Sequence, residues 1–218
     1  MAYTTVIFDL DGTLLNTLED LADSLNYVLA KRNHPTRTIN EVRDFVGNGV
    51  QVLCERALPR GAAKSEKTAV AAEFRARYKA HLQDKTRPYD GIIKLLEVLA
   101  ERGVKTAVVS NKFDAAVKAL CGEYFGGLIG SAAGESETVR KKPDPDMVLQ
   151  VIKELGGELS QTLYVGDSEV DVQTAQNVGI KCAGVTWGFR DKQVLINAGA
   201  DYIAKQPCKL IGIVQGEG

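Results

Sequence analysis

Residues 6–13 read Val-Ile-Phe-Asp-Leu-Asp-Gly-Thr, so a short apolar run leads directly into two carboxylates and a glycine. The apolar run is typical of a buried strand, and Gly12 is typical of the turn that follows one. Ligands of open α/β sheets bind beyond the carboxyl ends of the strands, where Asp9 and Asp11 would lie. Carboxylates at that place can bind a hard cation or attack phosphorus. Aspartate and glycine also occur at strand ends for backbone reasons alone, so the rest of the chain has to decide.

The bulk composition is that of a globular protein. The chain has 218 residues, of which 44% are hydrophobic and 25% are charged, and its net charge is −1. This length suits one large domain, or a core domain with a smaller insertion. The nearly balanced charge gives no indication of binding to nucleic acid or to an anionic membrane. Because no apolar run is long enough to span a membrane and no signal peptide precedes Asp9, we expect a cytoplasmic protein.

Cysteine and histidine form no recognisable motif in this chain. The four cysteines are widely scattered and include no Cys-x-x-Cys pair, which argues against a zinc site and against a disulfide framework. His34 and His81 are the only histidines, and neither has a catalytic motif around it. We therefore assign any acid–base chemistry to carboxylates or lysine rather than to a histidine triad.

The hydrophobic pattern divides the chain into two kinds of segment. From Thr17 to Lys31 the apolar period is helical, and Thr17 with Asp20 suggests a capping box. Residues 38–82 contain no good buried strand and predict helices over 39–45, 48–58 and 66–82. Beyond Gly91, strands alternate with helices. We expect strands at 106–109, 127–129, 162–165, 180–184 and 201–204, and helices at 92–102, 112–121, 144–155, 169–178 and from about 207.

This alternation predicts an α/β fold with a Rossmann-like parallel sheet and helices on both of its faces. The first strand of the sheet is the one that carries Asp9. We expect residues 1–14 and 88–218 to form the α/β core domain, and residues 15–87 to form an inserted α-helical cap domain. An insertion directly behind the first strand would lie over the strand ends like a lid.

Polar residues follow two further strands, and each has two interpretations. Ser110-Asn111-Lys112 follows strand 106–109 and could hold a phosphate, or it could simply cap the next helix. Asp167 follows strand 162–165, and Asp171 lies on the same helix face one turn later. These acids could bind a cation, or they could only favour the helix N-terminus through its dipole.

Lys142 stands between the basic residues 140–141 and Pro143, just before the helix expected from residue 144. Fixed by the proline, it could neutralise a phosphoryl group, although three consecutive cations are usually a solvated surface loop. Taken together, the strand ends combine carboxylates for a cation with a hydroxyl and a lysine for an anion. This combination indicates a magnesium-assisted phosphoryl site. Its members are Asp9, Asp11, Ser110, Lys142, Asp167 and Asp171.

The order of these motifs resembles that of the haloacid dehalogenase superfamily. The resemblance rests on Asp9-x-Asp11-Gly12-Thr13, Ser110-Asn111, Lys142-Pro143-x-Pro145 and Gly166-Asp167-x-x-x-Asp171, and it spans residues 5–185. The helical insertion is similar to the helical type of cap in that superfamily. Within it, the segments 46–58 and 184–188 are most similar to phosphoglycolate phosphatases. Asp11 is the second aspartate that the dehalogenases lack, so phosphate ester hydrolysis fits better than dehalogenation.

The resemblance implies a role for each matching position. Asp9 would attack phosphorus, and Asp11 would protonate the leaving alcohol and then activate water. The phosphoryl oxygens would be held by Thr13, Ser110, Asn111 and Lys142. Mg²⁺ would be bound by Asp9, by the backbone carbonyl of Asp11 and by Asp167. Asp171 would support either the metal's waters or Lys142.

The cap loop Gly47-Asn48-Gly49 has two interpretations. Its glycines permit backbone contact with a small carboxylate substrate, and they also suit a tight turn before the helix that begins at Val50. Arg43, Arg56 and Arg190 are candidates for binding such a carboxylate on the ground of charge alone.

We therefore expect a magnesium-dependent phosphatase that works through an aspartyl-phosphate, with 2-phosphoglycolate as its first candidate substrate. Alternatives of the same fold are an inorganic pyrophosphatase, a sugar-phosphate phosphatase and a phosphomutase. A non-catalytic regulatory module is the alternative from another class, and loss of Asp9, Asp11 or Asp167 would have been its mark. The expected partner is a small phosphate ester, with no nucleic acid and no membrane, and the expected assembly is a monomer or a homodimer.

Overall fold

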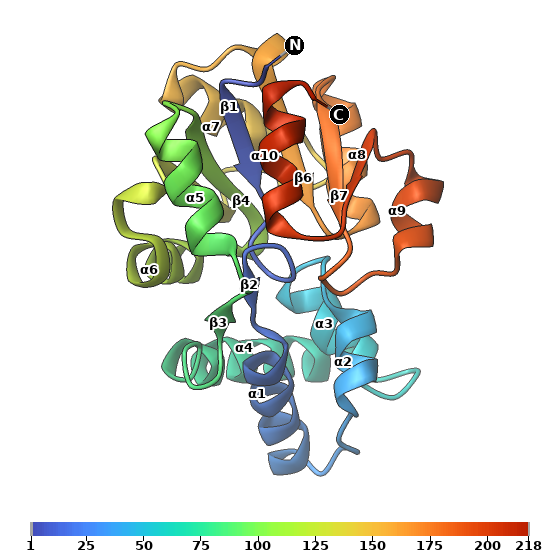
Figure 1. Cartoon of the computed structure of the whole chain (residues 1–218). Coiled ribbons are helices and arrows are strands. Elements are labelled where there is room, and N and C mark those ends of the chain that lie inside the picture. The colour runs from blue at the N-terminus through green and yellow to red at the C-terminus, as the bar shows by residue number, and fades with distance from the viewer. Residues whose placement is uncertain (1, 218) are drawn as a thin grey trace.

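The computed structural model describes residues 2–217, and a six-stranded sheet forms its centre (Figure 1). All neighbouring strands are parallel, in the order β5-β4-β1-β6-β7-β8. The fold class expected from the sequence is therefore confirmed. The strands are β1 (Thr5–Phe8), β4 (Lys105–Phe113), β5 (Ser131–Glu135), β6 (Thr162–Gly166), β7 (Lys181–Val185) and β8 (Tyr202–Ala204).

Helices cover both faces of this sheet. Alternate side chains of β1 point to opposite faces, as the pleat of a strand requires. Val6 and Phe8 pack with the helices α5, α6 and α10, whereas Ile7 packs with α7, α8 and α9. The helices are α5 (Ile92–Glu101), α6 (Asp114–Phe125), α7 (Asp146–Leu155), α8 (Glu169–Val178), α9 (Lys192–Ala198) and α10 (Pro207–Gln215).

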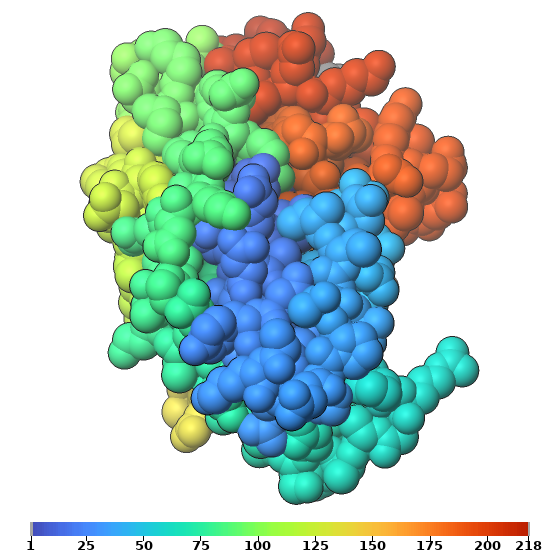
Figure 2. Space-filling model, turned by 90° about the horizontal axis from the view of Figure 1, so that it is seen from below, coloured from blue at the N-terminus to red at the C-terminus, as the bar shows by residue number. Residues whose placement is uncertain are grey.

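Four helices between β1 and α5 form a separate helical unit below the sheet in Figure 1. The chain enters and leaves this unit side by side, because Leu15 pairs with Pro88 and Asn16 pairs with Arg87. Seen from below in Figure 2, the unit lies in front of the sheet domain. The elements are β2 (Leu15–Asn16), α1 (Leu18–Lys31), α2 (Ile39–Phe45), α3 (Val50–Ala57), α4 (Lys64–Ala80) and β3 (Arg87–Pro88).

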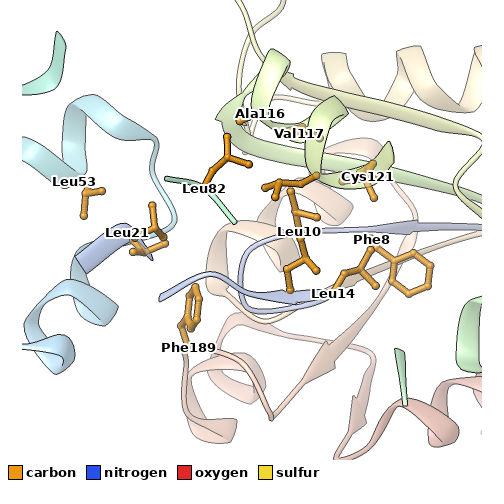
Figure 3. Close-up of a cluster of buried hydrophobic side chains, with 14 of the residues drawn as sticks. Phe8, Leu10, Leu14, Leu21, Leu53, Leu82, Ala116, Val117, Cys121 and Phe189 are labelled. Carbon is orange, nitrogen blue, oxygen red and sulfur yellow. The ribbon is translucent and has the colours of Figure 1, made fainter. Parts of the chain in front are cut away.

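A continuous apolar core joins the helical unit to the sheet domain (Figure 3). Leu21 and Leu53 of the unit belong to the same buried cluster as Leu10, Leu14 and Phe189 of the sheet domain. Because buried apolar surface stabilises at about 25 cal/mol per Å², this cluster favours contact between the two parts. The helical unit is thereby held over the carboxyl ends of the strands.

The predicted strand at residues 127–129 was wrong. Residues Gly126–Leu128 form a 3₁₀ helix, and the edge strand is Ser131–Glu135. Within this strand Gly134 has a steric reason: a Cβ there would lie 2.6 Å from both the Lys112 carbonyl oxygen and the Asp114 Cα. A search for bulky β-branched residues therefore selects the wrong segment here.

Two other local predictions also need correction. The strand β4 continues through Ser110-Asn111-Lys112 to Phe113, so these residues do not cap a helix, and α6 begins only at Asp114. Thr17 stands at the start of α1, but its side chain makes no capping hydrogen bond and the expected capping box is absent. The sequence-based predictions also do not include the strands β2 and β3 and the helix α9. Among the residues that the structure describes, no helix is long and apolar enough to cross a membrane.

Candidate active site

The parallel register brings the polar strand ends together. Phe8 at the end of β1 lies beside Val108 of β4 and Val165 of β6. The next residue, Asp9, donates its backbone N–H to the Val165 carbonyl oxygen over 2.8 Å. Asp9 therefore lies between Ser110, which is two residues beyond Val108 in β4, and Asp167, which directly follows β6.

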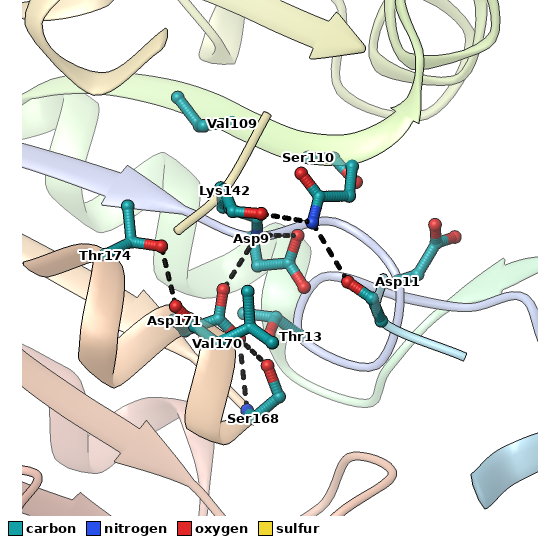
Figure 4. A network of polar contacts seen from close by, with 12 residues as sticks. Asp9, Asp11, Thr13, Val109, Ser110, Lys142, Ser168, Val170, Asp171 and Thr174 are labelled. Carbon is teal, nitrogen blue, oxygen red and sulfur yellow. Dashed lines mark hydrogen bonds and ion pairs between the residues drawn. The ribbon is translucent and has the colours of Figure 1, made fainter. Parts of the chain in front are cut away.

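Lys142 reaches this edge from the loop before α7 and is almost fully buried. Its Nζ lies 2.8 Å from Oδ1 of Asp9 and 2.7 Å from Oδ1 of Asp171 (Figure 4). The hydroxyl of Tyr164 lies 3.1 Å from the same Nζ. Burial opposes the charge of Lys142, but Asp171 and Asp9 outweigh it and raise the pKa of the ammonium group. Lys142 is thus a buried cation, and the interpretation as a solvated surface loop does not apply to it.

Asp9 is a buried carboxylate with one oxygen engaged by Lys142. Burial raises its pKa to about 7, although the nearby Lys142 ammonium acts in the opposite direction. Its Oδ2 makes no side-chain hydrogen bond within residues 2–217. The side chain therefore combines a fixed orientation with one oxygen that is free to react.

Asp171 makes hydrogen bonds both to Lys142 and to the residue before α8. Its Oδ2 accepts hydrogen bonds from the backbone N–H and the hydroxyl of Ser168, at 3.0 and 2.6 Å. Its Oδ1 is held by Lys142, and the Tyr164 hydroxyl also donates to it over 3.3 Å. Because both oxygens are engaged, Asp171 acts here by orienting the lysine.

Asp167 lies at the end of β6 beneath two glycines. Its Oδ1 accepts from the Thr13 hydroxyl at 3.3 Å, and its Oδ2 accepts from the backbone N–H of Phe189 at 2.6 Å. A Cβ on either Gly12 or Gly188 would lie 2.4 Å from an Asp167 oxygen, so glycine is required at both positions. Burial, then Asp171 and Asp9, raise the pKa of Asp167 well above its usual range.

A divalent cation fits this group of acids. Oxygen atoms of Asp9, Asp167 and Asp171 all lie within 4.8 Å of one another. Lys142 pairs with Asp9 and Asp171 but not with Asp167, so the three buried carboxylates, when ionised, carry more negative charge than this one ammonium offsets. Hard oxygen ligands with excess negative charge suit a cation such as Mg²⁺. Asp11 contributes no side-chain oxygen to this group. A contribution from its backbone carbonyl is what the family resemblance implies.

The side chain of Asp11 is held by two residues that the sequence reading did not assign to the site. Nζ of Lys112 lies 2.7 Å from Oδ1 and 3.0 Å from Oδ2 of Asp11. The Thr17 hydroxyl donates to Oδ1 over 2.6 Å. Lys112 could have been found because it directly follows Ser110-Asn111 at a strand end, whereas no local pattern identifies Thr17.

The expected phosphate-binding residues are close to Asp9, but not all of their donors are free. Ser110 is buried, and its hydroxyl oxygen accepts the backbone N–H of Lys112 at 3.3 Å. Asn111 uses its amide group to donate to the carbonyl oxygens of Gly47 and Lys142, at 3.1 and 3.0 Å. Asn111 thereby ties the strand end both to the Lys142 loop and to the helical unit.

A small cavity of about 50 Å³ lies between the helical unit and the strand ends. Asp9, Asp11 and Asp167 line it from the sheet domain, and Gly47 and Gly49 line it from the helical unit. The turn expected at this loop is also present, because Gly49 precedes α3 with φ +86°. Asn48 uses its backbone carbonyl to accept a hydrogen bond from Lys141 at 3.0 Å.

Arg190 fastens the helical unit to the sheet domain. Its guanidinium donates to the carbonyl oxygens of Arg43 and Val46, at 2.9 and 2.7 Å, and to Glu169 at 3.3 Å. Arg56 is turned to the carbonyl of Phe45 instead. Arg190 and Arg56 are therefore engaged with the protein itself.

Comparison with known proteins places this arrangement in context. The family model for haloacid dehalogenase-like hydrolases matches residues 6–185. Phosphoglycolate phosphatase 1 of Pseudomonas aeruginosa is 36% identical over 194 residues, which cover 84% of this chain and 70% of the relative. The phosphoglycolate phosphatase of Mesorhizobium japonicum is 34% identical over 199 residues, which cover 89% of this chain and 87% of the relative.

Solved structures agree over nearly the whole chain. A crystal structure from Lactobacillus delbrueckii subsp. bulgaricus, provisionally described as a phosphoglycolate phosphatase, has a TM-score of 0.95 and 36% identity. The alignment covers 99% of this chain and 100% of that one. The similarity therefore includes the helical unit as well as the sheet domain.

Proposed function

The chain belongs to the haloacid dehalogenase-like hydrolases and is a phosphoric monoester hydrolase, and we propose that its substrate is 2-phosphoglycolate, which it converts to glycolate and phosphate. The curated relatives named phosphoglycolate phosphatase support this substrate. Within the structure, the support comes from the small cavity over Asp9. Its free volume of about 50 Å³ lies well below the several hundred Å³ of a drug-sized pocket, which favours a leaving group of few atoms.

We assign the nucleophile to Asp9 and the acid–base role to Asp11. In the first step an Asp9 oxygen attacks phosphorus, the bond to the alcohol oxygen breaks, and Asp11 gives its proton to that oxygen. In the second step Asp11 takes a proton from water. The water oxygen then attacks phosphorus, and the bond between phosphorus and Asp9 breaks to release phosphate.

Lys142 supplies positive charge to the Asp9 carboxylate through Oδ1, and we assign the attack to the other oxygen, Oδ2. Repulsion between a carboxylate and a phosphate dianion opposes attack, and a fixed ammonium at 2.8 Å reduces it. We assign Thr13, Ser110 and Asn111 to the surroundings of the phosphoryl group, and Gly47, Asn48 and Gly49 to the loop above the leaving group. Ser110, Asn111, Gly47 and Gly49 already line the cavity, so we expect their contacts to form without large movement.

We infer that the cation at this site is Mg²⁺, held by Asp9, Asp167 and the backbone carbonyl of Asp11. When bound, it supplies the positive charge that offsets the phosphoryl oxygens and the buried carboxylates. The glycines that crowd Asp167 fix that carboxylate against β6, so the ligand is already oriented before the cation arrives.

We further propose that residues 15–87 form a cap domain on a core of residues 1–14 and 88–218. The side-by-side crossing of β2 and β3 supports these limits. Because the substrate would be a dissolved metabolite, we place the reaction in the cytoplasm and expect a monomer or a homodimer. Cell fractionation and light scattering test these two points.

A substrate panel tests the proposed activity directly. The panel compares 2-phosphoglycolate with hexose phosphates, nucleoside monophosphates, glycerol phosphate and pyrophosphate. We expect kcat/KM to be highest for 2-phosphoglycolate. A preference for pyrophosphate would assign the chain to pyrophosphatases instead. If the protein converts a sugar phosphate only when a sugar bisphosphate is added as activator, the chain would be assigned to phosphomutases.

A further inference from the structure

Lys112 is a buried lysine that touches the acid–base residue and not the nucleophile. It lies near the end of β4, and its side chain is only 3% exposed. Two of its three N–H bonds point to the carboxylate oxygens of Asp11, at 2.7 and 3.0 Å. Asp11 is the residue beside which the leaving alcohol must lie, so Lys112 stands on the leaving-group side of the site.

Lys112 is also the cation at the cavity with the fewest engaged donors. The cavity is lined by three cationic side chains, Lys112, Lys142 and Arg190. Lys142 is surrounded by three oxygens, and Arg190 holds two backbone carbonyls and Glu169. Among the carboxylates of the described residues Lys112 contacts Asp11 alone, and Tyr78 is its other neighbour at the cavity, so the ammonium keeps donor capacity on the side that faces Tyr78.

A second donor approaches the same place from the helical unit. Tyr78 of α4 lines the cavity, and the Lys112 ammonium lies 4.6 Å from the centre of its ring. The hydroxyl of Tyr78 is buried and has no hydrogen-bond partner within residues 2–217. Burial raises the pKa of this hydroxyl, so it remains a hydrogen-bond donor at neutral pH. A buried donor without a partner is costly, and a bound acceptor would satisfy it.

We propose that Lys112 and Tyr78 bind the carboxylate of the leaving group, so that the site selects phosphate esters of 2-hydroxy acids. This inference rests on the proposed function and names its specificity determinant. In such an ester, the carboxylate carbon is only two bonds from the oxygen that leaves. With that oxygen beside Asp11, the carboxylate lies within reach of the ammonium that already contacts Asp11.

The arrangement couples specificity to the position of the helical unit. Lys112 belongs to the sheet domain and Tyr78 to α4, so the carboxylate would be held by both parts at once. Esters with a neutral leaving group would leave both donors without an acceptor. Discrimination by unpaired buried donors is stronger than discrimination by shape.

The test compares Lys112→Met with the matched control Lys118→Met, since Lys118 is exposed and pairs only with Asp114. The substrates are 2-phosphoglycolate and 2-hydroxyethyl phosphate, which differ in the carboxylate. We expect Lys112→Met to lower kcat/KM on both, with a loss on 2-phosphoglycolate about 10- to 100-fold larger, as expected for a charge-assisted hydrogen bond. Tyr78→Phe should give a smaller loss in the same direction. Equal losses on both substrates would overturn the inference, because Lys112 would then only position Asp11.

A binding measurement separates this inference from the proposed function. Calorimetry with 3-phosphonopropionate and its amide compares a carboxylate with a neutral isostere without any hydrolysis. The unmodified protein should bind the acid at least tenfold more tightly, and Lys112→Met should remove that preference. If the preference survives in Lys112→Met, the inference is wrong even if 2-phosphoglycolate is the substrate. If the preference depends on Lys112 while 2-phosphoglycolate is a poor substrate, only the proposed substrate fails.

Discussion

The ammonium of Lys142 lies 2.8 Å from Oδ1 of Asp9, and both groups are buried at the end of the central strand β1. This pair fixes the orientation of the carboxylate, places a positive charge beside Oδ1 and leaves Oδ2 without a side-chain partner among the described residues. Asp171 completes the arrangement by holding the same ammonium from the other side, at 2.7 Å. The carboxylate that we propose as the nucleophile is therefore positioned before any substrate binds.

We expect Asp9→Asn to lower kcat by at least about 10³-fold, because an amide cannot form the acyl-phosphate bond. The fold should be retained, since Lys142 keeps its contact with Asp171. Steady-state kinetics with 2-phosphoglycolate and circular dichroism check these two outcomes. Asp144→Asn, on a more exposed loop, is the matched control and should retain full activity. Unchanged turnover in a pure Asp9→Asn preparation would refute the assignment of the nucleophile.

Metal binding should become stronger as the pH rises from 6 to 8. Burial raises the pKa of Asp9 to about 7, so protons compete with Mg²⁺ for this carboxylate at the lower pH. Without metal, the folded state binds more protons than the unfolded state between pH 4 and 7. Its stability should therefore fall as the pH rises through this range.

Differential scanning calorimetry with EDTA or with excess Mg²⁺ measures both effects. Asp9→Asn should flatten the dependence of Tm on pH in EDTA, and Asp167→Asn should reduce the stabilisation by Mg²⁺. A shift of Tm by Mg²⁺ that is the same at pH 6 and pH 8 would speak against Asp9 as a ligand.

The sequence was sufficient for the parts of the fold that long periodic patterns determine. The parallel sheet and the helical insertion followed from the alternation of strands and helices, and α8 was predicted at its observed limits. The strand β5 could not be found in this way, because its sequence reflects the close packing of Gly134 against Lys112 and Asp114. Contacts of that kind depend on tertiary structure and leave no periodic signal.

The same distinction applies to the site. Asp9, Lys142 and Asp167 stand at strand or helix ends in ordered motifs, so they could be identified as one group. Thr17 looked like a helix cap, yet its hydroxyl donates to Asp11 instead. A local rule cannot tell whether this hydroxyl accepts a hydrogen bond from the helix N-terminus or donates one to Asp11, because the loop of Asp11 is placed by the tertiary fold.

Thr17→Val should slow the hydrolysis of 2-phosphoglycolate by about tenfold, because Asp11 loses the 2.6 Å hydrogen bond that helps to orient it. p-Nitrophenyl phosphate has a good leaving group that needs little protonation, so its first step should be affected less. Single-turnover kinetics on both substrates measure the difference. Thr68→Val is the control, since Thr68 is an exposed threonine of α4 far from the site. A larger loss on p-nitrophenyl phosphate would contradict the role given to Thr17.

Arg190→Lys should raise KM for 2-phosphoglycolate several-fold. The guanidinium holds the carbonyl oxygens of Arg43 and Val46 together, and a single ammonium cannot reproduce this forked geometry. The helical unit should then close less often over the cavity, and the apparent affinity falls with the fraction of closed molecules. Arg140→Lys, at an exposed ion pair with Asp144 and Asp146, is the matched control and should leave KM unchanged. Small-angle X-ray scattering of Arg190→Lys should show a larger radius of gyration in the absence of substrate. An unchanged KM together with an unchanged radius would mean that the apolar cluster around Leu21 and Phe189 alone keeps the two parts together.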